Sequence, residues 1–245
     1  MRTLLTTFLG TCLTLLCGCA SIQRSYLFYP THHSGVNGLD VWEVEARTIG
    51  YRRPVPAPRN VWLMLHGNAG QAVDRAYALR SFSPDDAVFI LEYPGYGARE
   101  GNPSKASFNA AAREAYALLR KTFPATPICV MGESIGSGPA CMLASQSPPP
   151  DKIVLVVPFD KLTSVAADHA RILPVSLLLE AKWDNIHALS KYTGPVEIFG
   201  AEQDAVIPIG HAKKLAGSVP SARFHCIPGG HNDWSQGTSV EIRNP

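Results

Sequence analysis

The sequence has little net charge, and it lacks the cysteine and histidine spacings that bind metal ions. Its 245 residues carry 22 Lys and Arg against 20 Asp and Glu, which gives a formal net charge of +2. A nucleic-acid groove or a polybasic membrane surface needs a clear basic excess, so this balance excludes both kinds of partner. CxxC pairs and an HExxH motif are absent from the sequence. We therefore expect neither a metal site nor a cofactor.

A hydrophobic run long enough to cross a bilayer is also missing. The Leu-rich stretch 4–16 has about 13 residues, whereas a transmembrane helix needs about 20. It follows a single positive charge, Arg2, and it ends in Leu16-Cys17-Gly18-Cys19. A short apolar run behind a positive residue is typical of a secretory signal peptide.

The end of this stretch resembles the bacterial lipoprotein box, in which Leu and two small residues precede a Cys that becomes lipidated. The resemblance implies that residues 1–18 are removed and that Cys19 becomes the lipidated N-terminus. With Ala20 next, it implies an anchor in the bacterial cell envelope, at the outer membrane facing the periplasm. An ordinary cleaved secretory signal and retention in the membrane remain the alternatives.

The rest of the chain has the composition of a globular protein, with 46% hydrophobic and 17% charged residues. Continuous apolar runs, typical of strands covered on both faces, alternate with helical patterns. The runs are 61–65, 87–91, 128–131, 153–157, 196–199 and 223–227, the helical patterns are 72–82, 104–123, 135–146 and 208–217, and 41–46 alternates like an edge strand. Such alternation predicts an α/β fold with a mostly parallel sheet and helices on both faces.

The chain organisation predicted from this pattern is a single α/β domain over residues 19–245, and we expect a monomer. Residues 158–194 are long for a simple connection and contain the apolar stretch 172–179, so they are predicted to form a small lid-like insertion. Cys129, Cys141 and Cys226 lie in apolar contexts. We expect all three to be buried thiols.

The motif that carries chemistry is Gly132-Glu133-Ser134-Ile135-Gly136. It satisfies GxSxG, follows a predicted buried strand and precedes a predicted helix, which is the context of a nucleophile elbow. The flanking glycines leave room for a sharp, strained turn. We therefore predict that Ser134 is a nucleophile.

A serine nucleophile needs a general base, and the base needs a carboxylate that fixes its tautomer. His231 follows the last predicted strand, and Asp204 follows the strand before it. The order Ser134, Asp204, His231 is the order of α/β-hydrolase triads. Asp160, after the strand that ends near Val157, is the alternative acid.

An oxyanion hole is the remaining requirement, because attack on a carbonyl builds negative charge on its oxygen. The backbone N–H of Ile135 is one predicted donor. The second is expected from the Gly-rich loop His66-Gly67-Asn68-Ala69-Gly70, with the N–H of Asn68 as our candidate.

These residues belong to a wider resemblance. The chain resembles the α/β-hydrolase branch of ABHD13- and ABHD17-like (Bem46-type) serine hydrolases in VWLMLHGNAG, LEYPGYGARE, VMGESIGSGPA, and GAEQDAVIP followed by GGHND. The resemblance covers residues 26–235. It implies an α/β-hydrolase fold and hydrolysis of esters or thioesters, with acyl-protein thioesterases among the relatives. It does not include the N-terminus. The family has a membrane helix or an acylated Cys cluster there, whereas this chain has the lipoprotein-like signal sequence.

We therefore predict a serine hydrolase that cleaves small acyl esters or thioesters through an acyl-enzyme intermediate. Two alternatives remain open at this point. A peptidase or amidase of the same fold uses the same triad, and an envelope lipoprotein on a hydrolase scaffold uses none of it.

Overall fold

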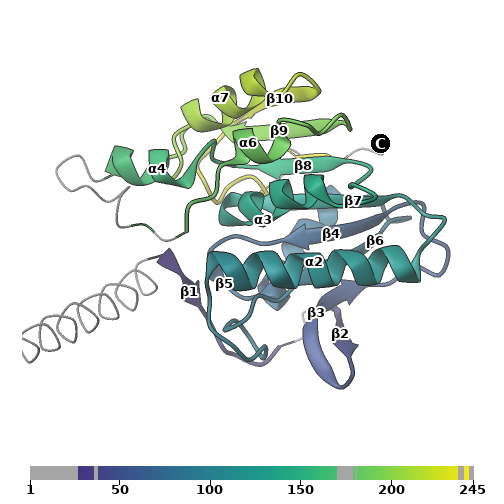
Figure 1. Ribbon diagram of the computed structural model, residues 1–245. Coiled ribbons are helices and arrows are strands. Elements are labelled where there is room, and N and C mark those ends of the chain that lie inside the picture. Colours follow the sequence, from purple (N-terminus) through teal and green to yellow (C-terminus); the bar gives the residue numbers. More distant parts are fainter. Residues whose placement is uncertain (1–26, 36–37, 170–178, 180, 237–239, 243–245) are drawn as a thin grey trace, which may run out of the picture.

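The computed structural model describes residues 27–35, 38–169, 179, 181–236 and 240–242 (Figure 1). The predicted signal peptide 1–18, Cys19 and the apolar stretch 172–178 lie outside these residues. In the part of the chain that is described, no helix is long and apolar enough to cross a membrane.

The centre of the fold is an eight-stranded sheet in the order β10-β9-β8-β7-β4-β6-β3-β2. The six strands from β10 to β6 are mutually parallel, and β3 and β2 extend the sheet in antiparallel fashion. The strands are β2 (Asp40–Val44), β3 (Arg47–Arg53), β4 (Val61–Leu65), β6 (Ala87–Leu91), β7 (Ile128–Glu133), β8 (Ile153–Val156), β9 (Val196–Ala201) and β10 (Ala222–Ile227). A separate two-stranded sheet pairs β1 (Tyr29–Pro30) with β5 (Ala69–Gly70).

The position of strand β4 inside the sheet explains why residues 61–65 form a continuous apolar run. Its five residues are all buried, because successive side chains of a strand point to opposite faces and both faces are covered. Leu63 and Leu65 belong to the core on one face of the sheet, and Trp62 and Met64 belong to the core on the other. The prediction of a mostly parallel sheet with helices on both faces is confirmed.

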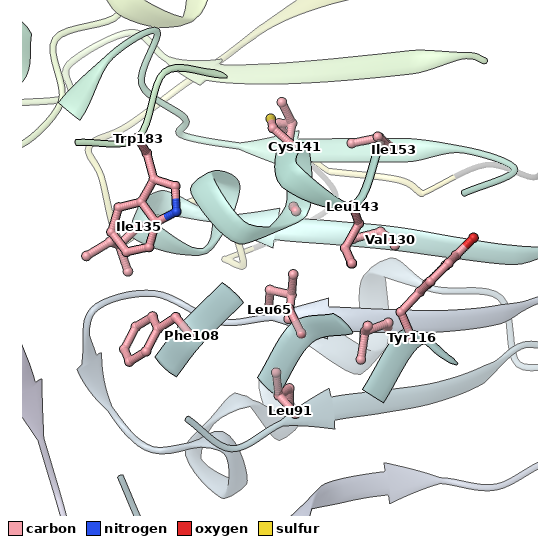
Figure 2. Close-up of a cluster of buried hydrophobic side chains, with 14 of the residues drawn as sticks. Leu65, Leu91, Phe108, Tyr116, Val130, Ile135, Cys141, Leu143, Ile153 and Trp183 are labelled. Atoms are coloured by element: carbon pink, nitrogen blue, oxygen red, sulfur yellow. The ribbon is translucent and has the colours of Figure 1, made fainter. Parts of the chain in front are cut away.

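The first core lies between the sheet and helices α2, α3, α6 and α7 (Figure 1). Figure 2 shows part of it, where Leu65, Leu91 and Val130 of the sheet face Phe108 and Tyr116 of α2. The second core contains apolar residues of the 3-10 helix η1 and of the C-terminal segment. The helices are η1 (Ala72–Ser81), α2 (Lys105–Thr122), η2 (Ser134–Gly136), α3 (Ser137–Met142), η3 (Leu143–Ser145), α4 (Leu162–His169), α6 (Asn185–Leu189) and α7 (Gly210–Ser218).

The strand order places a functional site at one end of the sheet. Strand β4 lies between β6 and β7. The chain runs from β4 to β6 on one side of it and then returns through α2 to β7 on the other side, so the direction of strand addition reverses at β4. Ligands bind at such a switch point, outside the carboxyl ends of the strands. The loop that begins at His66 follows β4, and Ser134 follows β7. Both therefore lie at the edge where a ligand is expected.

Two features differ from the sequence-based expectation. Strand β3 was not predicted, because Arg47–Arg53 has no clean alternation. Its Gly50 lies against β6, where a side chain would meet the backbone of Ile90. The expected burial of all three thiols is wrong for Cys226, which is exposed, whereas Cys129 and Cys141 are buried. Cys226 belongs to β10, the strand at the edge of the sheet, where covering is incomplete.

Candidate active site

Ser134 occupies the sharp turn between β7 and the helical segment that follows it. Its φ is +52°, a left-handed conformation that is strained for a residue with a side chain. The turn is possible because the neighbouring glycines leave space. A Cβ at Gly132 would lie 2.7 Å from the Cβ of Ala140, and a Cβ at Gly136 would overlap the carbonyl oxygens of Leu65 and His66. The predicted helix 135–146 consists of η2, α3 and η3 in succession.

The structure brings Ser134, His231 and Asp204 together. Nε2 of His231 lies 2.9 Å from Oγ of Ser134, and Nδ1 of His231 lies 2.8 Å from Oδ2 of Asp204. A carboxylate beside Nδ1 selects the tautomer that carries the proton on Nδ1. Nε2 is then free of a proton and accepts the hydrogen bond of the serine hydroxyl.

The carboxylate of Asp204 is held by the loop that follows β9. Its side chain is 1% exposed, and its Oδ1 accepts hydrogen bonds from the backbone N–H groups of Val206 at 2.9 Å and Ile207 at 2.7 Å. These bonds leave Oδ2 for His231. The imidazole, 11% exposed, is therefore oriented by a carboxylate that is itself fixed.

The candidate oxyanion loop, residues 66–70, is held by two tyrosines that follow β6. The hydroxyl of Tyr93 donates to the carbonyl of His66 at 3.0 Å, and that of Tyr96 donates to the carbonyl of Asn68 at 2.8 Å. Both rings are buried. Asn68 and Ile135, whose N–H groups are the predicted oxyanion donors, line the same pocket as Ser134.

This pocket is a cavity of about 610 Å³ at the carboxyl ends of the strands. One side of it contains Ser134, His231 and the loop residues Gly67 and Asn68. Apolar side chains form much of the rest. They come from the N-terminal segment, η2, the segment after β8, α4, the segment before α6 and the loop after β9: Leu27, Tyr29, Ile135, Phe159, Leu162, Val165, Leu179, Val206 and Ile207. Leu179 is the one residue of the predicted apolar lid stretch that is described. The cavity suits a substrate with an apolar part beside the reacting group.

The alternative acid, Asp160, does not contact His231. Its Oδ1 lies 2.7 Å from Nδ1 of His211, and its Oδ2 lies 2.6 Å from Nζ of Lys214, both on α7. Another acid of the predicted lid, Asp184, caps α6 and forms an ion pair with Lys161. Among the described acids, Asp204 is therefore the one whose carboxylate lies beside His231.

Sequence reasoning missed several side chains that hold the site. Tyr93 and Tyr96 lie in LEYPGYGARE, which contributed only to the family resemblance. Their position directly after a buried strand could have indicated a role at the site. The segment after β6 and the oxyanion loop after β4 both lie at the carboxyl ends of parallel strands. Glu133, the second residue of GxSxG, was also overlooked as a functional group.

Comparison with curated proteins finds relatives in bacteria and eukaryotes. A Mycobacterium tuberculosis protein described as uncharacterized is 34% identical over 176 residues, covering 70% of this chain and 62% of the relative. Protein bem46 of Schizosaccharomyces pombe is 30% identical, covering 73% and 63%. Lysophosphatidylserine lipase ABHD12 of Danio rerio is 27% identical, covering 79% and 58%. The chain thus spans about six-tenths of the length of these relatives.

Solved structures share the fold at lower identity. An alpha-beta hydrolase from Vibrio vulnificus superposes with a TM-score of 0.66 at 19% identity, covering 79% of this chain and 74% of that chain. The Pyrococcus furiosus esterase Pf2001 superposes with a TM-score of 0.64 at 12% identity, covering 85% and 92%. No protein-family model matches the chain.

Proposed function

We propose that this chain, which has the α/β-hydrolase fold and is similar in sequence to lysophosphatidylserine lipase ABHD12 and protein bem46, is a serine hydrolase that cleaves carboxylic esters or thioesters of acyl substrates. One observation carries the proposal: the continuous chain of contacts from Ser134 Oγ through the His231 imidazole to Asp204. This is the arrangement that activates a serine hydroxyl at neutral pH.

In the proposed acylation step, Oγ of Ser134 attacks the carbonyl carbon of the substrate while Nε2 of His231 takes the hydroxyl proton. Negative charge develops on the carbonyl oxygen, and the N–H groups of Asn68 and Ile135 stabilise it. The tetrahedral intermediate then collapses. The bond to the leaving group breaks, and the alcohol or thiol leaves with the proton from His231.

Deacylation repeats these steps with water. His231 removes a proton from water, the resulting hydroxide attacks the acyl-enzyme carbonyl, and the proton returns to Oγ as the carboxylic acid is released. Asp204 stabilises the imidazolium in both halves of the cycle. The apolar lining of the cavity supports an acyl chain as the part of the substrate next to the carbonyl.

An active-site-directed fluorophosphonate tests the mechanism directly. We expect it to label the wild-type protein and to leave Ser134→Ala unlabelled. Ser145→Ala is a matched control, because Ser145 is exposed a short distance along the same helical segment. Absence of labelling in the folded wild-type protein, or equal labelling of Ser134→Ala, contradicts the proposal.

The bond that is cleaved is tested by comparing p-nitrophenyl esters, thioesters and aminoacyl anilides of matched acyl groups. We expect the esters or thioesters to be turned over faster than the anilides. Faster turnover of the anilides indicates a peptidase or amidase. A folded protein without activity on any of them indicates a binding role on a hydrolase scaffold.

We also propose that the enzyme is anchored in the bacterial envelope by lipid on Cys19. The support is the Leu16-Cys17-Gly18-Cys19 sequence. A clickable palmitate analogue is expected to label the wild-type protein in cells and not Cys19→Ala. Cys226→Ala, which removes an exposed thiol of the folded domain, is expected to keep the label.

A further inference from the structure

The residue that precedes the nucleophile, Glu133, is a buried carboxylate that the triad chemistry does not use. It is the last residue of β7, and its side chain is 7% exposed. Burying a carboxylate costs free energy unless hydrogen bonds and an opposite charge compensate. The groups that contact its two oxygen atoms must therefore compensate for the cost of burying it beside Ser134.

Three donors from three different segments converge on this carboxylate. Its Oε2 accepts a hydrogen bond from the N–H of Gly67, in the oxyanion loop, at 2.9 Å. Its Oε1 accepts from Nε1 of Trp234 at 3.2 Å, three residues after His231. The same Oε1 accepts from the hydroxyl of Tyr77, on η1, also at 3.2 Å. One side chain thus connects the oxyanion loop, the segment that follows His231 and a neighbouring helix.

The donors are supported by contacts among themselves. The rings of Tyr77 and Trp234 meet edge to face with centroids 5.7 Å apart. Arg75 donates to the Tyr77 hydroxyl at 3.0 Å and also to the carbonyl of Ala69. Its Nε lies 3.7 Å from Oε2 of Glu133. We call Arg75, Tyr77, Glu133 and Trp234 the Glu133 cluster.

The charge of Glu133 is compatible with this environment. Burial alone raises the pKa of Glu133, but attraction to Arg75 and the hydrogen bond from Gly67 outweigh burial and bring the pKa below its ordinary value. The group is therefore ionised at neutral pH. An ionised carboxylate only accepts hydrogen bonds, as its three donors require.

We propose that Glu133 is a positioning residue for hydrolysis, which holds the oxyanion loop and the His231 segment in register with Ser134 by accepting hydrogen bonds from both. The inference rests on the proposed function, because it concerns the same reacting groups. Displacing a reacting group by about 1 Å costs roughly 100-fold in rate. A shared anchor next to the nucleophile prevents such displacement.

Glu133→Gln is the sharpest substitution, because it keeps the shape of the side chain and removes its charge. An amide has one acceptor oxygen and one NH2 donor. Its NH2 must then face either the N–H of Gly67 or the donors of Trp234 and Tyr77. In either orientation the NH2 lies against another hydrogen-bond donor, and that hydrogen bond is lost. The guanidinium of Arg75 also loses its counter-charge. The variant is thus expected to lose stability as well as alignment.

Asp86 provides a matched control for the loss of stability. It is also a fully buried carboxylate, and it accepts hydrogen bonds from Nε1 of Trp62 at 3.0 Å and from Asn60 at 2.9 Å. It immediately precedes β6, and therefore lies at the amino ends of the parallel strands, opposite the active site. Asp86→Asn breaks the same kind of interaction away from Ser134.

The experiment compares kcat and KM for p-nitrophenyl acetate, together with urea unfolding, in the wild type and both variants. For Glu133→Gln we expect kcat to fall about 100-fold while KM stays within about threefold. For Asp86→Asn we expect loss of stability with kcat near the wild-type value. A kcat for Glu133→Gln within about threefold of wild type, or an equal fall in both variants, overturns the inference.

Two milder variants test the positioning role of Glu133 if Glu133→Gln does not fold. Tyr77→Phe removes one donor to the carboxylate and keeps the whole ring. Trp234→Phe removes the other side-chain donor and keeps an aromatic ring, at the cost of the second ring of the indole. Loss of one hydrogen bond from the His231 side is expected to lower kcat about fivefold in Trp234→Phe. Wild-type kcat in both variants overturns the inference.

The wild-type protein separates this inference from the proposed function. If the folded wild type is neither labelled by fluorophosphonate nor active on esters, the hydrolase assignment fails, and the positioning role fails with it. If the wild type is labelled and active while the Glu133 cluster variants keep full kcat, only the positioning role fails.

Discussion

The carboxylate of Asp160 lies 2.7 Å from Nδ1 of His211, in a buried pair that is separate from the triad. Nε2 of His211 lies 3.0 Å from Asp168 on α4, so the imidazole is held between two carboxylates. His211 is on α7, and α4 contributes Leu162 and Val165 to the wall of the pocket. The pair therefore connects α7 to the helix that borders the pocket, and we expect its role to be structural.

The first prediction separates Asp160 from Asp204. In Asp204→Asn the amide donates to Nδ1 of His231 and imposes the wrong tautomer, so kcat for an ester is expected to fall about 10³- to 10⁴-fold. Asp160→Asn is expected to keep kcat within about threefold and to lower the free energy of unfolding by about 1–3 kcal/mol. Steady-state kinetics and urea unfolding measure both effects. A loss of kcat in Asp160→Asn as large as that in Asp204→Asn contradicts the assignment.

The second prediction concerns the pH dependence of the contribution of Asp160 to stability. Burial raises the pKa of Asp160, but hydrogen bonds from Lys214 and His211 outweigh it and leave the pKa below its ordinary value of 3.8. A lowered folded-state pKa stabilises the protein above the unfolded-state pKa, and the stabilisation is lost as pH falls through the folded-state pKa. The stability difference between wild type and Asp160→Asn is expected to be larger near pH 5 than near pH 2. Urea unfolding at several pH values measures it, and a difference that grows on acidification argues against this account.

The third prediction tests the space around the nucleophile turn. Gly136→Ala places a Cβ onto the carbonyl oxygens of Leu65 and His66, which belong to the backbone and do not yield cheaply. We expect a loss of about 3 kcal/mol in stability and of most activity. Gly217→Ala is the control, because nothing lies within 4 Å of a Cβ there. In a helix it is expected to stabilise by about 0.5–1 kcal/mol. Thermal unfolding of the two variants checks both signs, and equal effects refute the steric argument.

The fourth prediction concerns the acyl side of the pocket. Val165 lies on α4 and lines the cavity, so Val165→Phe fills part of the space assigned to the acyl chain. Exclusion of two methylenes, at about 0.8 kcal/mol each, lowers kcat/KM for long-chain esters about tenfold and leaves acetate esters nearly unchanged. Ala167→Phe is the control, because Ala167 is exposed on the same helix. A series of p-nitrophenyl esters from two to twelve carbons measures the effect. An equal loss at every chain length places the acyl chain elsewhere.

Local sequence patterns predicted much of the fold. The run Val61–Leu65 is apolar at every position because both faces of β4 are covered, and its bounds were predicted without error. The helical pattern 104–123 corresponds to α2, with Ser104 as its N-terminal cap. Strand β3 was missed because its place is set by contact with β6 and not by a pattern of its own.

The chain order also predicted which residues meet at the candidate site. GxSxG, a carboxylate after the next-to-last strand and a histidine after the last one follow from the way parallel strands end at one edge of a sheet. The same reasoning did not exclude Asp160 as the acid of the triad, since Asp160 also follows a parallel strand at that edge. Side-chain direction separated the two acids, because Asp204 reaches His231 and Asp160 reaches His211.

The sequence by itself therefore determined the class of fold, the strands that end at the site and the residue types that meet there, because these follow from periodicity and short motifs. Only the tertiary structure decided how the site is held. Glu133 contacts Gly67 and Trp234, which are 66 and 101 residues away along the chain. No local pattern records such a contact, because its partners become neighbours only when the strands are assembled in one sheet.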